Sequence, residues 1–99
     1  MRTQEELNKL FTDAYFNCVD TGGGCLAWLH KLENGDEILI SNSNSNIPQV
    51  GDNEIGVGLW SADGEELAVW YNLTSVDEAL FVAQWYVLEY YSEKEQEDK

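Results

Sequence analysis

The scarcity of basic residues is the strongest restriction that this sequence places on its function. Five Lys and Arg stand against 19 Asp and Glu in 99 residues, which leaves a formal net charge of −14. A surface that binds nucleic acid needs Lys and Arg to neutralise phosphates, so we expect no direct contact with DNA or RNA. An acidic excess of this size serves solubility, steering or contact with a basic partner.

Linkers, apolar runs and cysteines are scarce as well. With one proline and no Pro-rich or Gly/Ser-rich linker, we expect a single domain at 1–92 and an acidic, frayed tail at 93–99. No apolar run could span a membrane, and the polar start is unlike a signal peptide, so a cytoplasmic location is predicted. Cys18 and Cys25 are then predicted to be reduced core residues rather than a disulfide.

Aromatic residues, in contrast, are plentiful. The chain has four Trp, five Tyr and three Phe, and 43% of its residues are hydrophobic. Acidic chains that stay unfolded are poor in such residues. A folded core is therefore expected.

The first helix is predicted from a capping box. Thr3 and Glu6 have the spacing of that motif, and apolar residues then recur at helical intervals as far as three consecutive glycines at 22–24. Glycines end helices. We therefore expect an amphipathic helix over 4–20.

Two hairpins are predicted next, because Asn34-Gly35 and Asp63-Gly64 each lie between apolar segments. The expected strands are 25–32 with 37–41, and 54–61 with 66–72. Two-residue turns would pair Leu29 with Ile40, Lys31 with Ile38, Leu59 with Ala68, and Val57 with Trp70. In the first hairpin, Leu29, Ile38 and Ile40 would then face inward, and Trp28, His30, Leu32 and Leu39 outward.

The last helix follows a second capping box, formed by Ser75 and Glu78, and is predicted over 76–91. It is apolar on nearly every side, since its outward face would carry Phe81, Val82, Trp85, Tyr86 and Leu88. Either helices cover both faces of the sheet, or this helix contacts a partner or a second copy of the chain.

These elements predict an α+β fold: a four-stranded antiparallel sheet of two hairpins, flanked by an N-terminal and a C-terminal helix. In a meander both tight turns lie at the same end of the sheet. The start of the first helix, with Glu5 and Glu6, and the end of the second, with the acids from Glu89 to Asp98, would lie there too. The acids expected on the turns are Glu33, Asp36, Glu37, Asp63, Glu65 and Glu66. A simpler explanation is that they only keep turns and strand edges soluble.

Catalysis has little support in the sequence. His30 is the lone histidine, without a second histidine or a cysteine at metal-ligand spacing. The glycines at 22–24 follow a helix, whereas a phosphate-binding loop precedes one. We expect no catalytic residue, no metal, no cofactor and no enzymatic activity.

In size, acidity and helix-hairpin-hairpin-helix order, the chain resembles the small acidic proteins that phages use against bacterial defence, including anti-CRISPR and DNA-mimic inhibitors. The resemblance implies that carboxylates occupy the Lys/Arg surface with which a nuclease or CRISPR effector holds nucleic acid. On this hypothesis the partner-binding residues are Glu33, Asp36, Glu37, Asp63, Glu65 and Glu66, with Trp60 as an apolar anchor.

Two alternatives remain open. The chain could be an immunity protein that neutralises a basic nuclease toxin, since such inhibitors are also small and acidic and bind through charge complementarity around aromatic anchors. It could instead be an acidic homodimeric accessory module without an inhibitory role, with helix 76–91 as its interface. In that case the charge would serve solubility alone.

Overall fold

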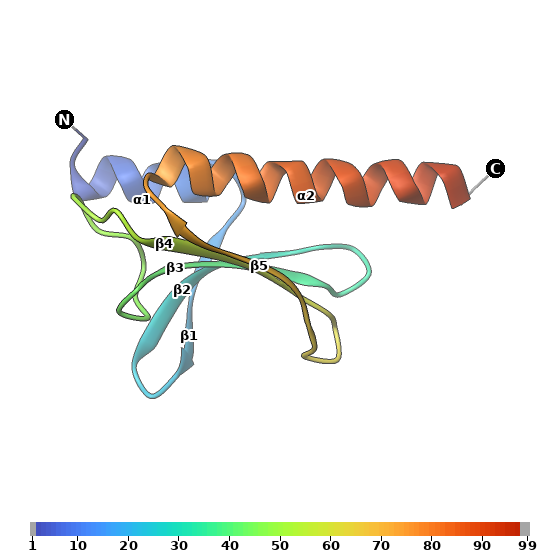
Figure 1. Ribbon diagram of the computed structural model, residues 1–99, viewed down its shortest axis with the longest axis horizontal. Helices are drawn as coiled ribbons and strands as arrows, with labels where there is room; N and C mark the ends of the chain where they lie inside the picture. The colour runs from blue at the N-terminus through green and yellow to red at the C-terminus, as the bar shows by residue number, and fades with distance from the viewer. Residues whose placement is uncertain (1, 98–99) are drawn as a thin grey trace.

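Five antiparallel strands follow one another along the chain, with a helix before and a helix after them. The computed structural model describes the backbone of residues 2–97 and the side chains of residues 2–90 and 92. The elements are α1 (Gln4–Asp13), β1 (Asn17–Gly22), β2 (Cys25–Lys31), β3 (Glu37–Asn42), β4 (Ile55–Trp60), β5 (Glu66–Leu73) and α2 (Val76–Glu97). The sheet order is β1-β2-β3-β4-β5, and both helices lie along the same side of the sheet (Figure 1). The α+β prediction is confirmed, but the sheet has five strands instead of four.

The additional strand comes from the second half of the predicted first helix. The helix begins at the predicted capping box of Thr3 and Glu6 but ends at Asp13. Tyr15 has a φ of 68°, and the Phe16 N–H donates to the Phe11 carbonyl, so the chain reverses there. Residues 17–22 then pair with β2, and the glycines at 22–24, all with positive φ, form the turn between the two strands.

The first predicted hairpin, between β2 and β3, is in a different register. Trp28 pairs with Ile40 and His30 with Ile38, one residue away from the predicted pairs. The Leu32 N–H donates to the Asp36 carbonyl, so the loop contains three residues instead of two, and its last residue, Gly35, has a φ of 95°. A slip of one residue exchanges the faces of a strand.

The faces predicted for β2 are therefore wrong for several residues. Trp28 and Leu32 are buried, and the Trp28 ring stacks on Phe11 of α1 with centroids 5.1 Å apart. His30 lies on the same face, its Nδ1 3.1 Å from the Tyr15 carbonyl oxygen. Leu29, which pairs with Leu39, points to the face that the helices leave open.

The second predicted hairpin keeps its register. Leu59 pairs with Ala68 and Val57 with Trp70, as predicted. Its loop also has three residues, because the Ser61 N–H donates to the Glu65 carbonyl. A β-bulge between Leu59 and Trp60 takes up the extra residue, so the rest of the hairpin is unaffected.

The core lies between the helices and the sheet. Its fully buried side chains include Phe11, Ile38, Ile40, Ile55 and Val57. α2 contributes Val76, Ala79, Ala83 and Tyr86 to the same cluster. Tyr86 was expected on the outward face, so this part of the prediction is wrong, whereas Phe81, Trp85 and Leu88 are exposed. Both cysteines are free thiols, and Cys18 is exposed rather than in the core.

The two helices begin at the same end of the molecule. Arg2, next to the cap of α1, donates to both carboxylate oxygens of Asp77 in the first turn of α2, at 2.7 and 3.1 Å. This hydrogen bond and the charge of Arg2 lower the pKa of Asp77. The turns between β2 and β3 and between β4 and β5 lie toward the opposite end, on the side of the C-terminus (Figure 1). Because β1 reverses the chain once more, Glu5 and Glu6 lie away from these turns, and their predicted convergence is wrong.

The C-terminal tail is described only in part. The tail at 93–99, expected to fray, is helical as far as Glu97, and its side chains lie outside the described residues. Among the described residues, neither helix is long and apolar enough to cross a membrane.

Candidate partner-binding surface

The turns of the two predicted hairpins contact each other. The Ala62 N–H donates to Asp36 Oδ1 at 3.2 Å, which joins the β4–β5 turn to the β2–β3 turn. Gly35 lies so close that a Cβ placed on it would be 2.9 Å from the Cβ of Ala62. The two turns therefore form one continuous edge of the molecule.

Six carboxylates lie on this edge, and we call the set the acidic tips: Glu33, Asp36, Glu37, Asp63, Glu65 and Glu66. Four of them are exposed, and Asp36 and Glu37 are half-buried. Asp36 shapes the turn as well, since its N–H donates to Asn34 Oδ1 and its other oxygen accepts from Asn34 Nδ2. The predicted grouping of acids from two separate hairpins is thus present in the structure.

Among the side chains that the structure describes, few basic ones lie near the acidic tips. The ion pairs found among the described side chains are Arg2–Asp77, at the start of the two helices, and Lys9–Asp13, on α1. Lys31 stands opposite Glu37 in the β2–β3 ladder, although the structure forms no ion pair between them. A cationic partner would therefore meet carboxylates here that the protein itself only partly compensates.

Trp60, the predicted apolar anchor, lies directly beside two of these acids. It pairs with Glu37 on one side and with Glu66 on the other, so all three side chains share the face of the sheet that the helices do not cover. Trp60 is half-buried. Its position is next to the acidic tips, as the anchor hypothesis requires.

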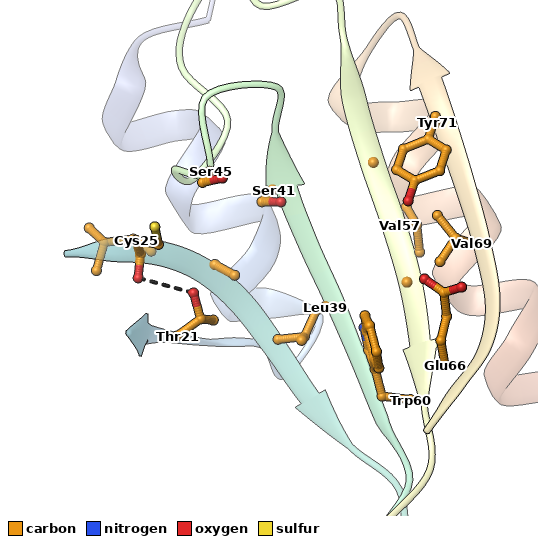
Figure 2. A pocket seen from close by; sticks show the side chains of 14 residues that line it. Thr21, Cys25, Leu39, Ser41, Ser45, Val57, Trp60, Glu66, Val69 and Tyr71 are labelled. Atoms are coloured by element: carbon orange, nitrogen blue, oxygen red, sulfur yellow. Dashed lines mark hydrogen bonds between the residues drawn. The ribbon is translucent and has the colours of Figure 1, made fainter. Parts of the chain in front are cut away.

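Beside Trp60 the open face of the sheet is hollowed. This open-face hollow has a volume of about 310 Å³, and its lining includes Leu39, Gly56, Gly58, Trp60, Glu66, Val69 and Tyr71. Figure 2 shows Trp60, Glu66 and Tyr71 around it, with the Glu66 carboxylate toward the Tyr71 side. Sequence reasoning did not identify Tyr71 or the hollow. The available signal was the pair Gly56 and Gly58 inside a predicted strand, since glycine in a strand often marks a close approach.

In the part of the chain that the structure describes, no three His, Cys, Asp or Glu side chains come together closely enough to hold a metal ion. Comparisons of the chain with protein-family models, with curated proteins and with solved structures find no match. We therefore infer function from the surface alone.

Proposed function

We propose that this protein is a non-catalytic cytoplasmic inhibitor that binds the basic nucleic-acid-binding surface of a nuclease or CRISPR effector and blocks access of the nucleic acid. The observation that carries the proposal is the contact between Ala62 and Asp36, which brings the carboxylates of two hairpins onto one edge. A nucleic-acid site is a set of Lys and Arg side chains spaced to neutralise phosphates. Carboxylates on an edge held by a hydrogen bond can pair with the same Lys and Arg side chains and so compete with the phosphates.

The proposed contact combines charge with an aromatic anchor. Buried aromatic residues surrounded by polar contacts supply most of the affinity in many interfaces, while surrounding charges raise the rate of association. Trp60 is flanked by Glu37 and Glu66 in the ladder, which fits both roles on one surface. The same surface would suit a basic nuclease toxin. An immunity protein would therefore act by the same mechanism on another partner.

The test compares two charge reversals of equal size. Asp63→Lys/Glu65→Lys changes two exposed acids of the tips, and Glu5→Lys/Glu54→Lys changes two exposed acids elsewhere. Tagged proteins would be used to capture partners from host lysate at low and raised salt. The captured protein would then be identified and assayed for DNA binding and cleavage.

We expect the wild type to capture a nucleic-acid-binding protein, to displace its DNA, and to lose it as salt is raised. The tip variant should inhibit at least about tenfold less well, and the control variant should be nearly unaffected. Unchanged inhibition by the tip variant, or a captured protein that still binds its DNA, would reject the proposal.

An accessory homodimer is the second candidate, and one observation favours it. Phe81 and Leu88 are 71% and 69% exposed on α2, and Trp85 between them is 45% exposed. Apolar side chains that are spaced along one side of a helix in this way form an interface when a second helix covers them. This role does not require the acidic tips, so the reversal variants distinguish the two candidates.

A further inference from the structure

We propose that the open-face hollow receives one arginine side chain of the partner, with its guanidinium stacked on an aromatic ring and paired with the Glu66 carboxylate. The proposal deepens the proposed function, because it rests on a basic protein as the partner. It adds a binding site for one side chain to a contact that otherwise depends on net charge.

The hollow exists because two glycines alternate along β4. A Cβ on Gly58 would lie 2.8 Å from Trp60 Nε1, so the indole ring rests against the backbone where a side chain would otherwise stand. A Cβ on Gly56 would lie 3.7 Å from Tyr71 Cδ1. Gly56 and Gly58 therefore give the hollow a floor of backbone, which the two rings approach closely, on the open face of the sheet (Figure 2). Its volume of about 310 Å³ is at the lower end of the range for ligand pockets, which suits a single side chain.

The lining favours a cation. Trp60 and Tyr71 supply aromatic rings, and Leu39 and Val69 supply apolar walls. Glu66 is the one charged side chain of the lining, and the described residues include no hydrogen-bond or ion-pair partner for its carboxylate. A cation over an aromatic ring gains from the negative face of the ring, and a carboxylate beside it adds a charge-assisted hydrogen bond.

Among biological cations the arginine side chain fits this lining best. Its guanidinium is planar, stacks on aromatic rings and is less strongly hydrated than the lysine ammonium group. A second copy of the chain cannot readily supply it. The sequence contains one arginine, Arg2, and that side chain is held by Asp77 at the far end of the molecule. The occupant is therefore an arginine of a different protein.

The first experiment uses a probe that needs no identified partner. The ¹⁵N-labelled full chain would be titrated with the peptide acetyl-Gly-Arg-Gly-amide and with the same peptide carrying citrulline, the neutral analogue of arginine. We expect the arginine peptide to shift the amide signals of Gly56 and Gly58 and the indole N–H signal of Trp60. Citrulline should bind at least about fivefold more weakly, because it lacks the charge. Equal shifts with both peptides, no shifts, or shifts confined to the turns would overturn the proposal.

Variants then locate the binding. Glu66→Gln should weaken the arginine peptide about fivefold, and the matched control Glu54→Gln should leave it unchanged. Gly56→Ala places a methyl group on the floor at ordinary contact distances, so the fold should be retained and can be checked by its melting temperature. Binding should fall in this variant as well. Wild-type binding by both Gly56→Ala and Glu66→Gln would overturn the proposal.

The outcomes separate this inference from the proposed function. If the arginine peptide fails to bind but Asp63→Lys/Glu65→Lys still loses the basic partner, the hollow has no such role and the inhibitor proposal stands. If the peptide binds in the hollow while that tip variant inhibits normally, the acidic tips are not the inhibitory surface.

Discussion

At the scale of single residues, Asp36 has a role that its charge alone does not indicate. It was predicted as a partner-binding acid, but its side chain accepts from Ala62 N–H and from Asn34 Nδ2 and so connects the two turns. The turn residues and their acids could be predicted from Asn-Gly and Asp-Gly. The contact between the turns could not, because it depends on the three-residue length of both loops.

Removing this carboxylate should separate the turns. We expect Asp36→Ala to lower the free energy of unfolding by about 1 kcal/mol and to speed hydrogen exchange of the Ala62 amide, which loses its acceptor. Exchange measured by NMR would check this. Asp63→Ala, in the neighbouring exposed turn, is the matched control and should leave that amide unchanged. Unaltered exchange in Asp36→Ala would mean that the turns are held together by something else.

Tyr86 is a second residue whose environment sets a prediction. Its hydroxyl is buried without a partner among the described residues, and its ring packs edge-on against Trp70 at 4.7 Å. A buried hydroxyl without a hydrogen bond is costly. We expect Tyr86→Phe to raise the free energy of unfolding by about 1 kcal/mol at neutral pH, measured by urea denaturation. A loss of stability would indicate that the hydroxyl has a partner, such as a buried water molecule.

The same burial raises the pKa of Tyr86 to about 12, from the usual value of 10.0. The unfolded chain therefore loses this proton at lower pH than the folded chain does. The contribution of the neutral hydroxyl to the free energy of unfolding is therefore fully present below pH 10, and it decreases as the pH rises toward 12. Denaturation curves between pH 9 and 12 should decline less steeply for Tyr86→Phe than for the wild type. Identical slopes would contradict this assignment.

At the scale of elements, sequence patterns predicted the elements with strong local signals. The capping box of α1 and the register near the middle of β4 and β5 are correct. β1 was missed because most of its side chains are exposed, so no alternation of apolar and polar residues marks it. Ala14, just after α1, and Cys18, within β1, continue the helical spacing of apolar residues and so extended the predicted helix. The conformation of β1 is set by backbone pairing with β2, and a local sequence pattern does not indicate such pairing.

α2 carries the clearest prediction at this scale. Its exposed Phe81, Trp85 and Leu88 should cause self-association, because water is excluded when a second helix covers them. We expect sedimentation to find dimers at about 100 µM for the wild type and monomers for Phe81→Gln/Leu88→Gln. Leu67→Gln, at another exposed apolar residue, is the control and should stay dimeric. A monomeric wild type at this concentration would rule out the interface.

At the scale of the whole molecule, the charge is less concentrated than the sequence suggested. The acidic tips hold six of the 19 acids, whereas Glu5 and Glu6 lie toward the other end. The sheet is the meander on which the predicted grouping of the turns depended, but the number of strands decides at which end α1 begins. Net charge alone therefore could not locate these two acids.

The net charge of −14 should also oppose the folded state. Like charges are brought closer together on folding, and salt screens their repulsion within about 10 Å at 0.1 M. We expect the melting temperature to rise by about 5 °C between roughly 20 mM and 500 mM NaCl. Potassium chloride should act equally if the effect is screening rather than binding of one ion. A melting temperature that falls with salt would mean that attractive pairs such as Arg2–Asp77 dominate.

The strand order has a kinetic consequence. Each strand pairs with the next one along the chain, so every hairpin can close without bringing distant segments together. Loops that close over few residues cost little entropy, and proteins rich in local contacts fold faster than β-proteins with distant pairings. The sheet can thus assemble hairpin by hairpin. Its apolar face, with Ile38, Ile40 and Val57, stays open to water until α1 and α2 dock, which makes docking of the helices the step that protects the folding chain from aggregation.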